Sequence, residues 1–193
     1  MTADSPGAVP VPDAGRDPSP PADSPQVDAA ALTQFWELAK VKAKLNRFEV
    51  YTGANPASAL IPPAWAFGAT PEQADSLLAL VLDGVKTGTA GALWDYEAEG
   101  EPIAEVGSLW IILDGSARPR ALIETTAVAV VPFDQVDAEH ARSEGEDDLS
   151  LASWRRIHED FFRSHASHDR GFQPDMPVVC ERFRVLYPTP RNA

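Results

Sequence analysis

The chain has 193 residues, of which 44% are hydrophobic, and it carries a formal net charge of −13 and a single cysteine. This length and apolar content suit one domain with a real core, and a single cysteine excludes an internal disulfide. The excess of carboxylates excludes extended duplex DNA as a partner, because duplex binding depends on clustered lysines and arginines.

Residues 1–29 differ in composition from the remainder of the chain. They hold seven of the eighteen prolines and no aromatic residue. Such a segment buries too little apolar surface to offset its ordering entropy, so we predict a disordered tail before a domain at residues 30–193. The sequence shows neither a secretory signal nor a run of membrane-spanning length, so we expect a cytoplasmic protein without a membrane partner.

The first elements of the domain are helical. Apolar positions from Leu32 to Ala43 predict a helix, and residues 46–69 predict an irregular connection anchored by Trp65 and Phe67. A second helix over residues 70–83 has Thr70 as its N-cap, Gln73 completing a capping box, and Gly84 as its left-handed end.

Strands follow, and then helices return. Residues 108–113 and 121–131 predict two strands joined by a hairpin turn at residues 114–120. A short helix is expected within residues 133–144, a longer one after a Ser150 cap, and a last strand at residues 178–186, where Cys180 would be a buried thiol. This order predicts an α+β fold whose antiparallel or mixed sheet closes into a small barrel.

The first candidate for chemistry is the stretch Gly84-Val85-Lys86-Thr87-Gly88-Thr89. Residues three apart on a regular strand face opposite sides, so Lys86 and Thr89 share a cavity only if the backbone turns between them. Gly88 is the residue that would permit such a kink. The alternative is a surface lysine at the start of a strand.

The acidic run after residue 138 supplies candidate partners for this lysine. One carboxylate pointing inward would orient Lys86, and composition alone does not choose among Glu139, Glu144 and Glu146. The remaining carboxylates would form a solvated face.

Aromatic and histidine residues complete the candidates. Trp94 and Tyr96 have rings on which a nucleobase can stack, although core packing explains Trp94 equally well. His158 falls on the apolar face of its helix, which is typical of a hydrogen-bonded core histidine. The spacing of His165 and His168 lacks a matching second ligand pair, so we predict no metal site and no cofactor.

From about Phe35 to Tyr187 the sequence resembles the ASCH family, which is related to the PUA-like RNA-binding barrels. The resemblance is carried by several short segments in order. They are residues 65–68, 74–75, 80–89, 92–97, 123–126, 132–133, 144–146, 154–158 and 161–162.

The resemblance implies a small β-barrel flanked by helices, with a cleft beside the Gly-x-Lys-x-x-Thr motif. Some small bacterial members are amidohydrolases that deacylate N4-acetylcytidine and similar nucleosides. Their catalytic lysine, threonine and glutamate match Lys86, Thr89 and Glu144. Those members carry an arginine two residues after the threonine, where this chain has Gly91.

Three functions therefore remain open. In the first, the cleft binds a nucleoside and hydrolyses its amide, with Thr89 attacking, a neutral Lys86 taking the proton, and Glu144 holding Lys86. That role requires a buried Lys86 beside only one carboxylate. In the second, the domain binds single-stranded RNA or a modified base, with Lys86 on phosphate and Trp94 stacking. In the third, it is a weak ribonuclease that uses His158. The sequence does not predict the oligomeric state.

Overall fold

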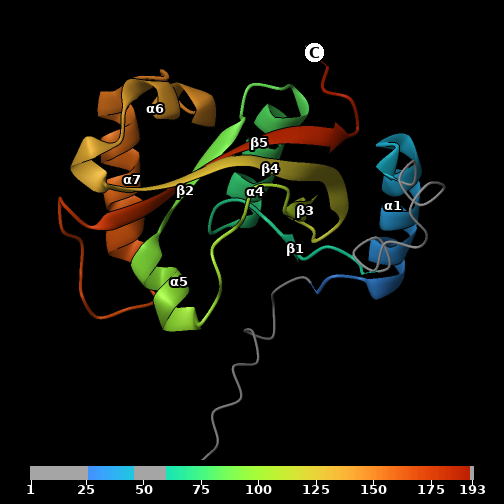
Figure 1. The fold of residues 1–193 in the computed structure, drawn as a ribbon, viewed down its shortest axis with the longest axis horizontal. Coiled ribbons are helices and arrows are strands. Elements are labelled where there is room, and N and C mark those ends of the chain that lie inside the picture. The colour runs from blue at the N-terminus through green and yellow to red at the C-terminus, as the bar shows by residue number, and fades with distance from the viewer. Residues whose placement is uncertain (1–25, 46–59, 192–193) are drawn as a thin grey trace, which may run out of the picture.

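The computed structural model describes residues 26–45 and 60–191. Its five strands form one mixed sheet in the order β1-β3-β4-β5-β2, which crosses the centre of Figure 1. β1 runs parallel to β3, and the other neighbouring strands are antiparallel. The strands are β1 (Ala64–Trp65), β2 (Gly88–Ala92), β3 (Leu109–Leu113), β4 (Pro119–Pro132) and β5 (Pro177–Tyr187).

The predicted α+β fold and mixed sheet are confirmed, but the sheet is not closed. Within the described residues β1 and β2 lie at opposite ends of the strand order and do not pair with each other. β1 contributes only two residues, and both pair with β3. The fold is therefore an open sheet flanked by helices, without the predicted barrel closure.

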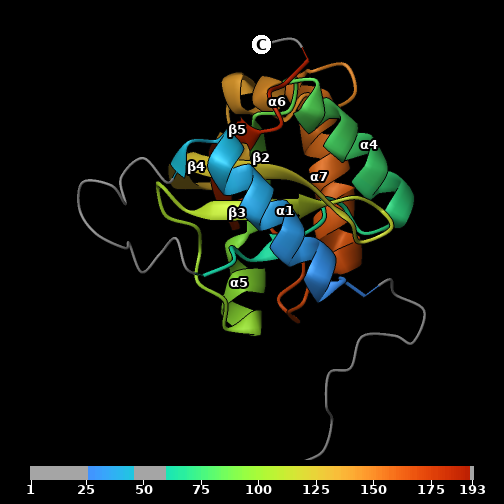
Figure 2. The same cartoon turned by 90° about the vertical axis from the view of Figure 1, so that its right-hand side faces the viewer.

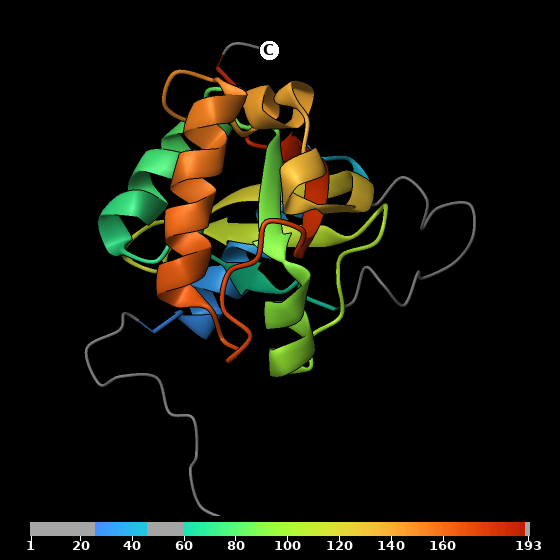
Figure 3. The ribbon, with the colours of Figure 1, turned by 90° about the vertical axis from the view of Figure 1, so that its left-hand side faces the viewer.

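Helices surround the sheet. They are α1 (Ala29–Lys42), α4 (Pro71–Leu82), α5 (Leu93–Glu99), the 3₁₀ turn η2 (Phe133–Gln135), α6 (Ala138–Glu144) and α7 (Leu151–His165). α6 and α7 lie toward the β2 edge, whereas α1 lies beyond the other end of the sheet (Figures 1 and 2). Figure 3 shows α7 with α4 on one side of it and β2 on the other. No helix in the described ranges has the length and apolar character needed to span a membrane.

Local signals set both ends of α4 and the start of α7 as predicted. The Thr70 hydroxyl accepts a hydrogen bond from the Gln73 amide at 3.3 Å, and Gly84 adopts φ +75°. The Ser150 hydroxyl likewise accepts from the Ser153 amide at 3.1 Å. The capping box differs in one detail, because Gln73 Oε1 accepts from the Ala69 amide.

Three apolar clusters hold the helices to the sheet. One, around Trp36, joins α1 to β3 and β4; another, around Val81, joins α4 to the middle strands. The third, around Trp154 and Phe133, joins α7 to β2 and β5 and includes the buried Cys180. The predicted tail and most of the predicted 46–69 connection lie outside the described residues, so both remain predictions.

Candidate functional site

Lys86 lies in the short loop between α4 and β2. The amides of Val85 and Lys86 both donate to the carbonyl of Leu80, at 2.9 and 3.1 Å, which turns the chain back over the end of the helix. The Lys86 side chain is only 1% exposed. The turn that lets Lys86 and Thr89 face one cavity therefore comes before the strand. The kink predicted at Gly88 is absent, because Gly88 lies within the ladder opposite Arg182.

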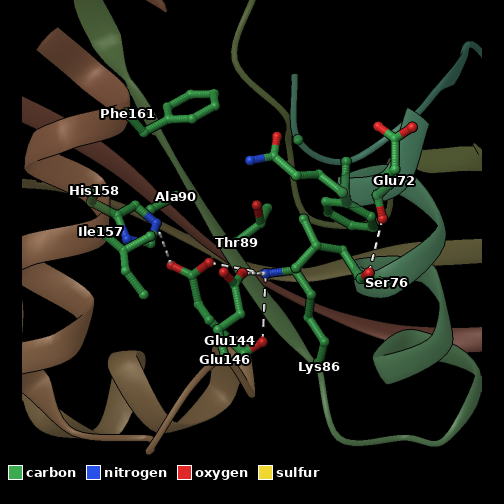
Figure 4. A pocket seen from close by; sticks show the side chains of 14 residues that line it. Glu72, Ser76, Lys86, Thr89, Ala90, Glu144, Glu146, Ile157, His158 and Phe161 are labelled. Atoms are coloured by element: carbon green, nitrogen blue, oxygen red, sulfur yellow. Dashed lines mark hydrogen bonds and ion pairs between the residues drawn. The ribbon is translucent and has the colours of Figure 1, made fainter. Parts of the chain in front are cut away.

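Two carboxylates bind the Lys86 ammonium. Its Nζ donates to Oε2 of Glu144 at 3.0 Å and to Oε1 of Glu146 at 2.7 Å (Figure 4). Glu139 instead pairs with Arg182 at 3.3 Å on the surface. The geometry thus selects two of the three candidate glutamates. Gly145, with φ +72°, ends α6 between them and lets both side chains reach the same amine.

Glu144 is held from its other side by α6 and α7. Its Oε1 lies 2.7 Å from Nε1 of Trp154, 3.1 Å from Nε2 of His140 and 3.4 Å from Nε2 of His158. Burial opposes ionisation of this carboxyl, but the Lys86 ammonium and the surrounding donors outweigh it, so its pKa is well below the usual value. Glu144 is a fixed, ionised group.

The charge state of Lys86 follows from the same contacts. Burial alone would lower the pKa of Lys86, but the attraction and hydrogen bonds of Glu144 and Glu146 outweigh burial and raise the pKa above its ordinary value. Lys86 is therefore an ammonium at neutral pH. A neutral lysine beside a single carboxylate, which the base role requires, is not what the structure contains.

These groups line a cavity of about 330 Å³, which we call the Lys86 pocket. α4 and α7 form its walls, and Thr89 and Ala90 of β2 line it between them (Figure 4). The Phe67 ring lies 5.3 Å from Lys86 Nζ, and Phe161 lies on the α7 side. The pocket thus combines aromatic walls, one hydroxyl, one ammonium and carboxylates.

A second cavity of about 510 Å³ adjoins the first, and we call it the Tyr96 pocket. The two cavities share Phe67, Gly68, Thr89, Ala90 and Phe161. Thr89 therefore lies where one cavity passes into the other.

The sequence model of the ASCH domain matches residues 63–187, which covers both pockets. The chain belongs to the ASCH family. A crystal structure of a protein from Enterococcus faecalis is similar, with a TM-score of 0.69 and 32% sequence identity, over 82% of this chain and 89% of that chain. The ASCH domain from Lactobacillus crispatus has a TM-score of 0.63 and 29% identity, over 77% of this chain and 96% of that chain. A comparison with curated proteins found no match.

The other predicted site residues of this ASCH domain, Trp94, Tyr96 and His158, do not share one pocket. Trp94 lines neither pocket: it packs beside the Trp154 cluster, with the Arg170 guanidinium 5.1 Å from its ring centre. Tyr96 lines the second pocket, where burial raises its pKa to about 12. His158 lines the Lys86 pocket, and its Nδ1 lies 3.0 Å from the carbonyl of Trp154.

Sequence reasoning did not assign a role to two residues at the pockets of this ASCH domain. Glu146 was one alternative among three, and Glu181 of β5 was not singled out. The cross-strand pairing of Glu181 with Thr89 depends on strands about ninety residues apart in the sequence, which leaves no local signal.

In the described part of the chain no group of three His, Cys, Asp or Glu side chains is arranged to hold a metal ion.

Proposed function

We propose that the Lys86 pocket binds an uncharged N-acylated nucleoside, of the N4-acylcytidine type, and hydrolyses its amide. The observation that carries this proposal is the meeting of the Lys86 ammonium, the Thr89 hydroxyl and the Glu146 carboxylate on one cavity with aromatic walls. Aromatic faces accept a nucleobase, and the three polar groups supply what acyl transfer needs.

The charge states assign the roles. The Thr89 hydroxyl attacks the acyl carbon and gives its proton to Glu146, while the Lys86 ammonium donates a hydrogen bond to the acyl oxygen as that oxygen becomes negative. The carbon–nitrogen bond then breaks, and Glu146 returns the proton to the leaving nitrogen. Water then attacks the Thr89 ester and gives a proton to Glu146, which passes it to the Thr89 oxygen as the ester bond breaks.

Glu146 suits proton transfer better than Glu144 does. Both oxygens of Glu144 already accept hydrogen bonds, and its side chain is 2% exposed. The carboxylate of Glu146 bonds only to Lys86 among the described residues, and the side chain is 23% exposed and lines the cavity. We therefore assign Glu144 the positioning of Lys86 and assign Glu146 the proton.

The charge of the pocket argues against the two phosphate-based alternatives. Three carboxylates, from Glu72, Glu144 and Glu146, line the cavity together with the single buried ammonium. A phosphate would meet net negative charge and an ammonium that is already paired, so neither RNA backbone binding through Lys86 nor ribonuclease chemistry is favoured. A pocket that binds a modified base without cleaving it is the second candidate, because the aromatic walls favour it equally.

The decisive experiment measures release of cytidine from N4-acetylcytidine. We expect Thr89→Val and Glu146→Gln each to lower kcat by about 100-fold or more, in the range known for loss of one acid–base or oxyanion group. Thr126→Val on the exposed face of β4 is the matched control and should leave kcat unchanged. Lys86→Ala needs a folding check by circular dichroism, because it leaves two carboxylates without their cation.

Two results separate the candidates. Binding of N4-acetylcytidine without turnover would favour the binding module. Equal, negligible turnover by the wild type and Thr89→Val, with no binding, would reject both.

A further inference from the structure

The Tyr96 pocket has no part in the hydrolysis just described, yet it begins at the attacking hydroxyl. It is the larger of the two cavities, at about 510 Å³ against about 330 Å³. Cavities of this size bind small molecules or parts of them. A substrate whose acyl carbon lies at Thr89 has room on both sides, with the base in the Lys86 pocket and the acyl chain extending into the Tyr96 pocket.

The walls of the Tyr96 pocket combine aromatic rings with carboxylates. Trp65, Trp110 and Tyr96 line it, as do Asp95, Glu99, Glu101 and Glu181. No lysine, arginine or histidine of the described ranges is among its lining residues. Aromatic faces and carboxylates together attract organic cations and repel anions.

Glu181 is the carboxylate of this pocket that lies on the strand paired with β2. It lies directly opposite Thr89 in the β2–β5 ladder, so the two side chains project from the same face of the sheet. Its Oε2 accepts from the Thr125 hydroxyl at 3.4 Å, and that hydroxyl accepts from Nε1 of Trp110 at 3.0 Å. Thr125 is 1% exposed, so a buried hydrogen-bonded chain holds the carboxylate in place.

Glu181 has no cationic partner among the described residues. Burial raises its pKa, because a half-buried carboxylate has lost water without gaining a counter-ion. Lys86, three residues before Thr89 in the chain, is already bound by Glu144 and Glu146. The described residues thus leave Glu181 without a cation, which a ligand could supply.

We propose that the Tyr96 pocket is a second subsite that receives an amine-bearing acyl chain, with its ammonium against Glu181 and the aromatic walls. The placement of the acyl carbon at Thr89 rests on the function proposed above. The substrate class is then a nucleoside acylated by an amino acid or a similar amine-tipped acyl group.

Gly91 and Tyr96 shape this subsite. A Cβ at position 91 would lie 3.0 Å from the Tyr96 ring, so the ring occupies the space in front of a glycine. Both residues line the pocket, and the phenol therefore forms part of its wall beside Thr89 and Glu181.

The test compares how tightly the full-length protein binds three acylated cytidines whose acyl chains have equal length. Their acyl groups end in an ammonium, a methyl or a carboxylate, and calorimetry gives each Kd for the Thr89→Val variant, which slows turnover. We expect the ammonium form to bind about tenfold or more tightly than the methyl form, as a partly desolvated cation–aromatic and ion-pair contact allows. Glu181→Gln in the same background should abolish that preference, whereas Glu97→Gln on the outer face of α5 should preserve it.

A second arm separates this inference from the proposed function. N-methyl-6-aminohexanamide carries an amide and an ammonium at the end of its acyl chain without a nucleobase, and N-methylhexanamide is its neutral counterpart. If no acylcytidine binds but N-methyl-6-aminohexanamide binds more tightly than N-methylhexanamide, and only with Glu181 present, the subsite stands and the nucleoside proposal falls. Acylcytidines that bind with no ammonium preference, or with a carboxylate preference, overturn the subsite and leave the nucleoside proposal intact. No ammonium preference in either arm overturns the subsite.

Discussion

The indole nitrogen of Trp154 lies 2.7 Å from Oε1 of Glu144, so a tryptophan of α7 holds the carboxylate that α6 presents to Lys86. Both groups are buried, at 4% and 1% exposure. Because Lys86 binds the other oxygen, Oε2, two helices and the loop before β2 meet at one carboxylate. The position of the ammonium over the pocket therefore depends on α7 as well as on α6.

Trp154→Phe should destabilise the fold by about 1–3 kcal/mol, because a buried carboxylate oxygen loses its closest donor. Urea unfolding gives this free energy. Trp36→Phe is the matched control: its indole nitrogen is buried without a partner among the described residues, so that substitution loses no hydrogen bond. An equal cost for the two substitutions would show that packing, and not the bond to Glu144, sets the effect.

Gly88→Ala should destabilise the fold for a steric reason. A Cβ there would overlap the Ser143 hydroxyl of α6 and lie 3.1 Å from the carbonyl of Glu181. Overpacking of this kind costs about 1–3 kcal/mol. Adding Ser143→Ala should recover part of the loss, which a double-mutant cycle by urea unfolding measures. No recovery would mean that the close approach of α6 is not the reason for the glycine.

The predictions that were correct rest on local signals. Hydrogen bonds between residues three apart set the starts of α4 and α7, and a left-handed glycine ends α4. Each of these contacts lies within a few residues in the sequence, so pattern and residue type suffice to predict it. The same holds for the hairpin, whose turn is closed by bonds between Asp114 and Arg118.

The errors arise where tertiary contacts decide. Gly88 was predicted to kink the backbone, but it is required by a helix that passes close to β2. The two-residue strand β1 forms only because β3 lies beside it, and α5 has no side-chain hydrogen bond at its N-cap, so neither was predicted. Glu146 reaches Lys86 because Gly145 turns the chain back after α6, which the acidic run does not indicate.

The pKa of Glu144 predicts a pH dependence of stability. Its folded pKa lies below the ordinary value of 4.5, so the unfolded chain takes up the proton first as the pH falls. The stability contributed by this carboxylate is present above pH 4.5 and is lost as the pH falls through the folded pKa. Glu144→Gln should thus be less stable than the wild type at neutral pH, and the gap should narrow below pH 4.5. Urea unfolding across this range measures the gap, and a constant gap would contradict the assignment.

The pH dependence of stability that comes from Glu181 should have the opposite sign. Its folded pKa lies above 4.5, so any stability from its protonated form is present below pH 4.5 and is lost as the pH rises through the folded pKa. At neutral pH the carboxylate therefore opposes folding. Glu181→Gln keeps an acceptor for the Thr125 hydroxyl and removes the charge, so its Tm should exceed that of the wild type at neutral pH and match it below pH 4.5. Calorimetric melting at the two pH values measures the difference, with Glu97→Gln, whose carboxylate pairs with Arg170, as the control that should gain nothing. A lower Tm for Glu181→Gln at neutral pH would mean that the fold already supplies a cation to this carboxylate, and the second subsite would lose its physical basis.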